Sequence, residues 1–195
     1  MFNVVKDAIP KNFADYVEGT LANIPLFWHP NTSYGPSSSN YQDALNLIAL
    51  DSNVVDNGQF THAVLEDGNI FSQHHAMLVP LLYFFAEQAN ITINTIERIR
   101  VNLLVQDKTF KSNNYNFPHT DSKDTYSFLY YVNDSDGDTF FFNEYFQNQL
   151  PSSFTLYNKL TPKKGTGVFF ESQRYHASSN PAISQARYVI NYNFK

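Results

Sequence analysis

Phe117-Pro118-His119-Thr120-Asp121 is the stretch from which the rest of the chain can be interpreted. His119 and Asp121 are two positions apart, so on an extended strand both side chains leave the same face. An imidazole and a carboxylate side by side supply two ligands of a metal site. His176, 55 positions after Asp121, is the best candidate for the third. Two His and one carboxylate, with the opposite positions open, favour non-haem Fe(II) and oxygen chemistry.

Arg187 makes the prediction of a metal site more specific, because a His-x-Asp pair alone can occur by chance on a surface strand. It stands 11 residues after His176 and opens the strand-like run Arg187-Tyr188-Val189-Ile190-Asn191-Tyr192-Asn193-Phe194. A guanidinium on an inward strand face is costly unless it meets an anion, and its planar fork suits a carboxylate. Arg187 therefore predicts an anion-binding position on the inner face of that strand.

The order of these residues resembles a known family. His119-x-Asp121, a distal His176 and Arg187 just beyond it are similar to the Fe(II)/2-oxoglutarate-dependent dioxygenase superfamily. Within that superfamily the resemblance is to the prolyl-4-hydroxylase-like branch.

The intervening segments carry the same resemblance. Leu129-Tyr130-Tyr131-Val132-Asn133 and Asp136-Gly137-Asp138-Thr139-Phe140 resemble the Tyr-Leu-Asn strand and the Gly-Gly-Glu-Thr-like hairpin of that branch. Pro162-Lys163-Lys164-Gly165-Thr166-Gly167-Val168-Phe169-Phe170 stands where the family has Pro-x-x-Gly before an apolar strand. The match covers about Thr95 to Lys195, and its departures are Asp138 in place of the second Gly and a short interval after Asp121.

The residues alone predict an antiparallel β sandwich or barrel with helices packed outside. The resemblance implies an α+β fold with a double-stranded β-helix (jelly-roll) core and N-terminal supporting helices. We expect residues 1–195 to form a single domain, with 1–94 as a helical support region and 95–195 as the catalytic core strands.

The resemblance also implies the roles of the site residues. His119, Asp121 and His176 would hold Fe(II), with 2-oxoglutarate and O2 as cosubstrates and ascorbate as a reductant. Arg187 would bind the far carboxylate of 2-oxoglutarate, with Tyr131 as the second choice for that carboxylate. The expected reaction is hydroxylation of an unactivated C–H bond, in a prolyl or other residue of a peptide or protein.

Two other functions stay open at this point. One is an oxygenase that acts on a small metabolite or nucleic acid. The other is a non-catalytic cupin-like metal-binding module, since the same β sandwich hosts both. Arg187 argues against the second, because a module that needs only metal has no use for that arginine.

The sequence also makes predictions for the residues around this site. Tyr131 and Tyr130 should point to opposite faces of their strand. Asn191 and Asn193 share a face with Arg187, and they could contact cosubstrate or substrate or else satisfy buried backbone groups. We expect Arg174 to face solvent. The remaining histidines, His29, His62, His74 and His75, are predicted to lie outside the metal site.

Composition limits the partners and the compartment. The chain has 195 residues, a net charge of -5 and no cysteine, so disulfides and thiolate sites are excluded. The negative charge disfavours nucleic acid and anionic membrane as partners. The N-terminus lacks signal-peptide architecture and no apolar run is long enough for a membrane span, so we expect a cytoplasmic protein.

The hydrophobic periodicity predicts the main elements. Helices are expected after Pro10 with Asn12 as the cap, over Tyr41 to Leu50, and over Ser72 to Asn90 with Pro80 inside. Loops are expected at Trp28-His29-Pro30 and Ser33 to Asn40, and Gly58 to Gly68 could hold a strand or hairpin. The predicted strands are Phe2 to Val5, the alternating segment from Thr95 to Val105, Ser127 to Val132, Thr139 to Phe142, Phe154 to Leu156, Val168 to Phe170 and Arg187 to Phe194.

Overall fold

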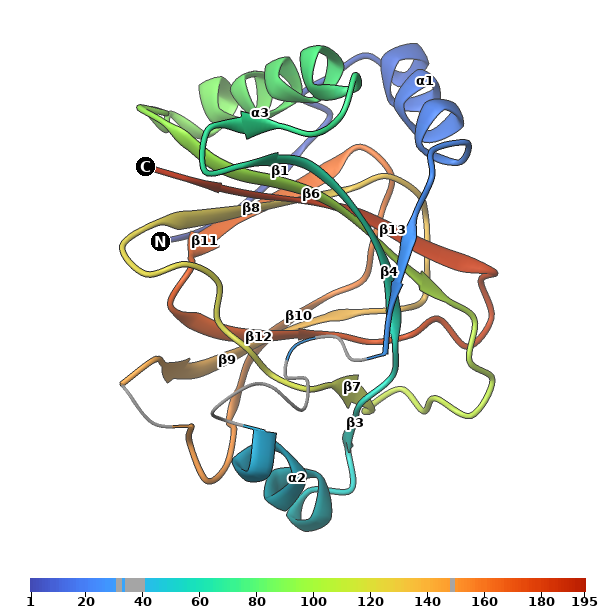
Figure 1. Cartoon of the computed structure of the whole chain (residues 1–195), viewed down its shortest axis with the longest axis vertical. Coiled ribbons are helices and arrows are strands. Elements are labelled where there is room, and N and C mark those ends of the chain that lie inside the picture. The colour runs from blue at the N-terminus through green and yellow to red at the C-terminus, as the bar shows by residue number, and fades with distance from the viewer. Residues whose placement is uncertain (31–32, 34–40, 148–149) are drawn as a thin grey trace.

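The computed structural model describes residues 1–30, 33, 41–147 and 150–195, and it consists mostly of antiparallel strands in two facing sheets (Figure 1). The large sheet has the order β1-β11-β8-β13-β6-β4-β2, with β5 paired to β4. Its strands are β1 (Phe2–Lys6), β11 (Thr166–Glu171), β8 (Tyr126–Tyr131), β13 (Ala186–Phe194), β6 (Ile96–Val105), β4 (Gln59–Glu66), β2 (Phe27–His29) and β5 (Asn69–Ile70).

The small sheet faces the large one and has the order β10 (Leu156–Leu160), β9 (Thr139–Tyr145), β12 (Arg174–Ser178). A short parallel pair, β3 (Val54–Val55) and β7 (Tyr115–Asn116), lies near it. Two facing antiparallel sheets of this kind form a jelly-roll-like fold.

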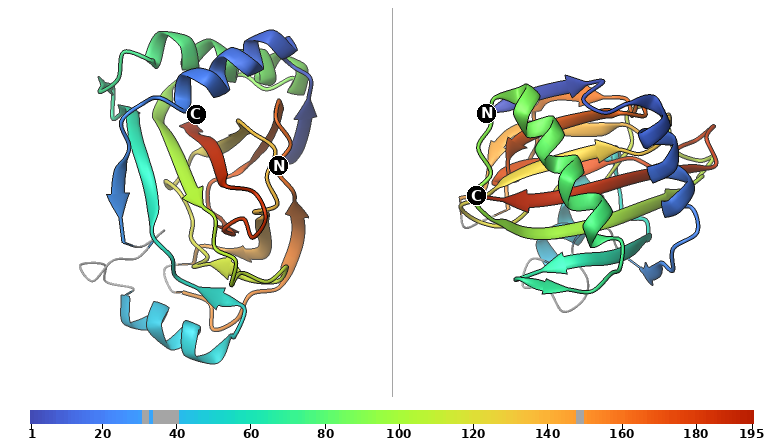
Figure 2. Two further views of the ribbon diagram at one scale, coloured as in Figure 1. Left: turned by 90° about the vertical axis from the view of Figure 1, so that its right-hand side faces the viewer. Right: turned by 90° about the horizontal axis from the view of Figure 1, so that it is seen from above.

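Three helices cover the sheets from outside. Helices α1 (Lys11–Leu21) and α3 (His75–Ala89) cross the outer face of the large sheet, and α2 (Tyr41–Leu50) lies at the opposite end of the molecule (Figures 1 and 2). The buried residues of α1 are Ala14, Val17 and Leu21, which helical spacing places on one side. None of the helices in the described part of the chain is both long and apolar enough to cross a membrane.

The strands of the large sheet divide their side chains between two layers. On β8, Phe128 and Tyr130 pack under the helices, whereas Leu129 and Tyr131 point between the sheets. Tyr130 and Tyr131 therefore face opposite ways, as the alternation predicts. Five polar residues of these strands line the cavity described below, namely Arg187 and Asn191 of β13 and Arg98, Arg100 and Asn102 of β6.

The N-terminal half departs from its predicted role. Residues 1–94 supply the strands β1, β2, β4 and β5 of the large sheet as well as three helices, so this half is more than a helical support region. The strand β2 includes Trp28 and His29, which the sequence assigned to a loop. It pairs with β4, which accounts for the extended backbone of so short a segment.

Smaller differences concern element ends. The first helix begins at Lys11 after Pro10, and no side chain caps it, so Asn12 is not the cap. Pro10 is well placed there because its ring presets the helical entry. The strand expected at Phe154 begins at Leu156. Of the loop predicted at Ser33 to Asn40, all but Ser33 lies outside the described residues.

Candidate metal centre

The backbone brings His119 and His176 together directly. The two residues form an isolated antiparallel bridge, in which each amide donates to the carbonyl oxygen of the other at 2.9 Å. Directly opposed residues carry neighbouring side chains. The two imidazole rings accordingly have centroids 4.5 Å apart. The structure thus brings the two predicted histidine ligands together. His119 lies in an isolated β-bridge and not in a full strand.

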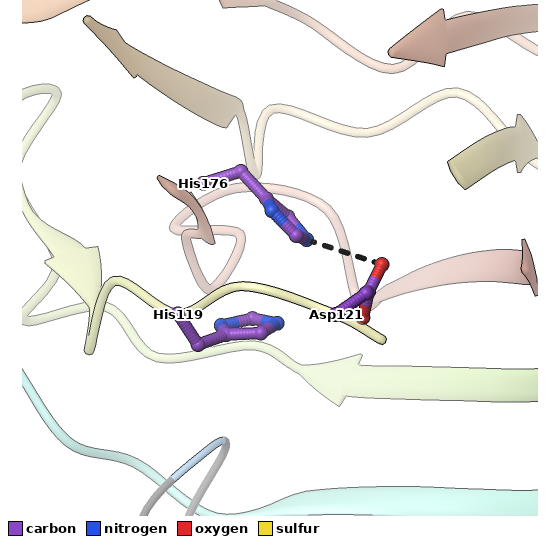
Figure 3. A group of neighbouring side chains, drawn as sticks. All are labelled: His119, Asp121 and His176. Atoms are coloured by element: carbon purple, nitrogen blue, oxygen red, sulfur yellow. Dashed lines mark ion pairs between the residues drawn. The ribbon is translucent and has the colours of Figure 1, made fainter. Parts of the chain in front are cut away.

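Asp121 completes the group. Its amide donates to the carbonyl oxygen of Ser172 at 2.9 Å, which keeps the chain alongside the segment that leads to His176. One ligand atom from each of His119, Asp121 and His176 lies within 4.8 Å of the others. All three side chains point toward one shared space, and Asp121 Oδ2 is 3.8 Å from His176 Nε2 (Figure 3).

The state of the histidine rings suits metal binding. His176 Nδ1 donates to the carbonyl oxygen of Arg174 at 3.1 Å, so in the neutral ring Nε2 keeps its lone pair toward Asp121. Burial, followed by the neighbouring His176, lowers the pKa of His119 to about 4. Burial also lowers the pKa of His176. Two neutral imidazoles and a carboxylate fit a divalent transition metal.

Four side chains hold the Asp121 carboxylate. Arg98 Nη2 donates to Oδ1 at 2.8 Å, and Ser127 Oγ donates to Oδ2 at 2.6 Å. Asn193 Nδ2 donates to Oδ2 at 3.1 Å, with Asn191 Nδ2 at 3.4 Å from both oxygens. Burial alone would raise the pKa of Asp121, but Arg98 foremost among the neighbouring groups lowers it overall. The carboxylate is therefore ionised and fixed in place.

Sequence reasoning missed Arg98 and Ser127 at this position. It also left Asn191 and Asn193 between cosubstrate contact and backbone satisfaction, whereas both amides donate to Asp121. The signal for the asparagines was their shared face with Arg187. The signal for Arg98 was its spacing of two from Arg100, which places both side chains on the same face of the strand predicted from Thr95 to Val105.

Arg187 lies on the same inner face of β13 and is only 3% exposed. Its Nε donates to the carbonyl oxygen of Gly137 and its Nη2 to Thr139 Oγ1, both at 2.7 Å. No ion pair joins Arg187 to a carboxylate among the residues that the structure describes. A buried cation whose partners are all neutral is costly unless an anion meets it, as the sequence predicts for Arg187.

Gly137 is needed for this arrangement. A Cβ there would lie 2.9 Å from Arg187 Cδ and 2.5 Å from the carbonyl oxygen of Ser179.

Tyr131, the second predicted carboxylate ligand, donates its hydroxyl proton to Thr139 Oγ1 at 2.8 Å. Thr139 Oγ1 thus accepts from Arg187 and Tyr131 at once, so its own proton is free to be donated elsewhere.

No protein-family model and no curated protein matches this sequence, but solved structures match along the chain. An oxidoreductase of the 2OG-Fe(II) oxygenase family from Burkholderia pseudomallei has 13% identity and a TM-score of 0.62, over 100% of this chain and 84% of that chain. A prolyl hydroxylase from Trichoplax adhaerens, in complex with a hypoxia inducible factor oxygen degradation domain peptide fragment, has 12% identity and a TM-score of 0.58, over 99% and 82%. The epimerase SnoN in complex with Fe3+, alpha ketoglutarate and nogalamycin RO has 11% identity and a TM-score of 0.57, over 99% and 78%.

The chain has the fold of the 2OG-Fe(II) oxygenases. Inside this oxygenase fold, His119, Asp121, His176 and Arg187 all line one cavity of about 250 Å³. Thr139 lines it too, so its free proton can be donated to a ligand there. Tyr131 does not line the cavity and reaches it only through Thr139.

The other histidines of the oxygenase fold lie apart from this group. His62 is held by the carbonyl oxygen of Pro25 and by Ser72 Oγ, each at 2.8 Å, which is a structural arrangement. His29, His74 and His75 do not join the three-residue group among the described residues.

Arg174 corrects a prediction. It is buried rather than solvent-facing, with its guanidinium over the rings of Tyr145 and Tyr157 at 4.5 and 4.3 Å from their centroids. Its Nη1 also donates to the carbonyl oxygen of Phe142 at 2.6 Å. Aromatic faces shelter the charge, which a sequence reading of a lone arginine beside a ligand segment cannot detect.

Proposed function

We propose that this chain is an Fe(II)/2-oxoglutarate-dependent dioxygenase that hydroxylates an unactivated C–H bond. Residues 1–195 would form one dioxygenase domain, with the two sheets as its double-stranded β-helix. The fold similarity supports this proposal, and so does the chemistry of the donor set formed by His119, Asp121 and His176. These three residues would hold the iron. When bound, iron supplies the redox chemistry that couples O2 and 2-oxoglutarate to hydroxylation, with succinate and carbon dioxide as coproducts.

The observation that carries the proposal is Arg187, a buried cation with neutral partners that lines the same cavity as the three ligands. It would bind the far carboxylate of 2-oxoglutarate through its planar fork. Thr139 would donate its free hydroxyl proton to the same carboxylate. Tyr131, predicted as a direct ligand, would act by fixing that hydroxyl through their hydrogen bond. A metal-only, cupin-like module has no use for this set of donors.

The substrate we propose is a prolyl or other residue of a peptide or protein. The similar structure of a prolyl hydroxylase with a peptide bound supports this choice, together with the motif resemblance. A small metabolite is the second candidate, which the similar SnoN complex with nogalamycin RO favours. The net charge of -5 disfavours nucleic acid.

The test is incubation of the protein with Fe(II), ascorbate and 2-oxoglutarate, with succinate as the readout. Mass spectrometry of a prolyl-containing peptide pool, and separately of a metabolite pool, then finds product that has gained oxygen. We expect succinate from the parent and none from Asp121→Ala. If the parent binds metal yet forms no succinate with any pool and does not bind 2-oxoglutarate, the metal-only module is the correct function.

A further inference from the structure

The cavity has a second basic region on β6. Arg98, Arg100 and Asn102 alternate along this strand and all line the cavity. In the pairing of β6 with β13, Arg100 lies opposite Asn191, whereas Arg187 lies opposite Leu104. Four strand residues separate the two positions, which is about 13 Å. Arg100 and Arg98 therefore occupy the end of the cavity away from Arg187.

Both arginines of this second region have a carboxylate partner, but one of their donors is left over. Arg98 pairs with Asp121 at 2.8 Å and Arg100 pairs with Glu66 at 3.1 Å. The Nε of Arg98 is buried and has no hydrogen-bond partner. Arg98 and Arg100 are two positions apart on β6, so their side chains leave the same face of the strand. Two adjacent cations with a donor left over attract an anion.

The charges around the cavity lead to the same result, on the basis of the proposed function. A divalent ion and the guanidinium groups of Arg98, Arg100 and Arg187 bring five positive charges. Asp121, the Glu66 partner of Arg100 and a 2-oxoglutarate dianion bring four negative ones. One positive charge is left, and an anionic group of the substrate would neutralise it.

We propose that the substrate presents an oxyanion, either a carboxylate or a phosphate, to Arg100 and Arg98 beside the metal centre. In a peptide substrate this group is an acidic or phosphorylated residue near the hydroxylated one. In a small-molecule substrate it is the acid or phosphate group of the molecule itself. Arg100 is the main anchor, because its partner Glu66 is partly exposed and can be displaced, whereas Arg98 holds the buried carboxylate of Asp121.

The test uses Mn(II)-loaded protein without oxygen and with saturating 2-oxoglutarate, so that the Arg187 end is filled. Calorimetry then measures the binding of inorganic phosphate, of acetyl-glutamyl amide and of its neutral counterpart acetyl-glutaminyl amide. We expect at least one of the two anions to bind, and the neutral amide to bind about tenfold more weakly or not at all. Phosphate and the carboxylate probe separate the two sources of the oxyanion.

Variants assign the binding to Arg100. Arg100→Gln should weaken the anion by about tenfold or more, whereas Glu66→Gln should strengthen it by freeing the guanidinium. The exposed Lys108 gives the matched control, since Lys108→Gln removes the same charge elsewhere and should change nothing. Arg100→Lys keeps the charge and is the second variant if Arg100→Gln does not fold.

Three outcomes overturn the inference. They are a parent that binds 2-oxoglutarate but neither anion, a parent that binds the neutral amide equally well, and an Arg100→Gln protein that loses 2-oxoglutarate instead of the anion. A parent that binds no 2-oxoglutarate at all contradicts the proposed function instead, so the two failures are distinguishable.

Discussion

The arginines at the two ends of the cavity differ in burial and in their partners. Arg187 is almost completely buried and donates to a carbonyl and a hydroxyl, so its charge has no carboxylate partner among the described residues. Arg98 and Arg100 have side chains 21% and 31% exposed, and each already pairs with a carboxylate. The enclosed end therefore suits one fixed anion of constant shape, and the more open end suits a group that varies in position.

This difference indicates how one cavity could bind 2-oxoglutarate at the Arg187 end and a substrate of its own at the β6 end. At the Arg187 end, the backbone of Gly137 and the hydroxyl of Thr139 set the position of the guanidinium before any ligand arrives. Preorganised donors of this kind lower the entropy cost of ordering side chains when a ligand binds. At the β6 end, Glu66 is itself partly exposed and can give way to a stronger partner.

The largest expected effect is at the three proposed metal ligands, which line the same cavity. His119→Ala, Asp121→Ala and His176→Ala should each abolish stoichiometric uptake of Fe(II) and production of succinate, because each removes one of three donors. Metal content by elemental analysis is the measurement. If His176→Ala bound iron as tightly as the parent, His176 would be the wrong third ligand.

A smaller effect should follow from moving Arg187 without removing it. Gly137→Ala forces a Cβ against Arg187 Cδ, and should weaken 2-oxoglutarate binding by about tenfold through a displaced hydrogen bond. Metal binding should be unchanged. Gly19→Ala is the control, since nothing lies within 4 Å of a Cβ at that position. Equal 2-oxoglutarate affinity in parent and Gly137→Ala, with both folded, would show that the Gly137 carbonyl does not position the arginine.

The dependence of metal binding on pH should be weak. Protons compete with metal for the imidazoles, and the pKa of His119 is lowered to about 4 while that of His176 is also lowered. Affinity for Mn(II) should fall by less than about tenfold between about pH 7.5 and 5.5, whereas two imidazoles of ordinary pKa would cost about a hundredfold. A hundredfold loss would show that the ligands are as accessible to protons as those of an unfolded chain.

No effect is expected from the remaining histidines. Substitution of His29, His62, His74 or His75 by Gln should leave Fe(II) content and 2-oxoglutarate affinity within about twofold of the parent, since none of these residues belongs to the site. His62→Gln alone should lower the unfolding temperature, because it loses bonds to Pro25 and Ser72. A marked loss of iron in His74→Gln or His75→Gln would mean that the metal site has another ligand.

Much of the centre was visible in the sequence because its chemistry is local. The spacing of His119 and Asp121, and the position of Arg187 on a strand-like run, are read directly from one segment each. The pairing of His119 with His176 depends on two segments far apart in the chain, and only the resemblance and the choice of ligand types suggested it.

What the sequence could not supply depends on which face of a strand is buried. The alternation on β6 correctly predicted a strand, but it did not show that its polar face lines a cavity, so Arg98 was missed. Arg174 was assigned to solvent because its aromatic neighbours come from other strands. The short strand β2 was missed for the same reason, since its extended form depends on pairing with β4.

The central claim is that Arg187 binds a carboxylate of 2-oxoglutarate, and calorimetric titration of the Mn(II)-loaded, anaerobic protein tests it directly. A buried arginine paired with a carboxylate contributes on the order of 2–4 kcal/mol when the loss leaves the partner unpaired. Arg187→Ala should therefore weaken 2-oxoglutarate by about 30-fold to 1000-fold, and Arg187→Lys should recover only part of this, because an ammonium lacks the planar fork. Metal binding should survive in both. Equal affinity in parent and Arg187→Ala would contradict the role of Arg187, and no binding by the parent would leave only a metal-binding module.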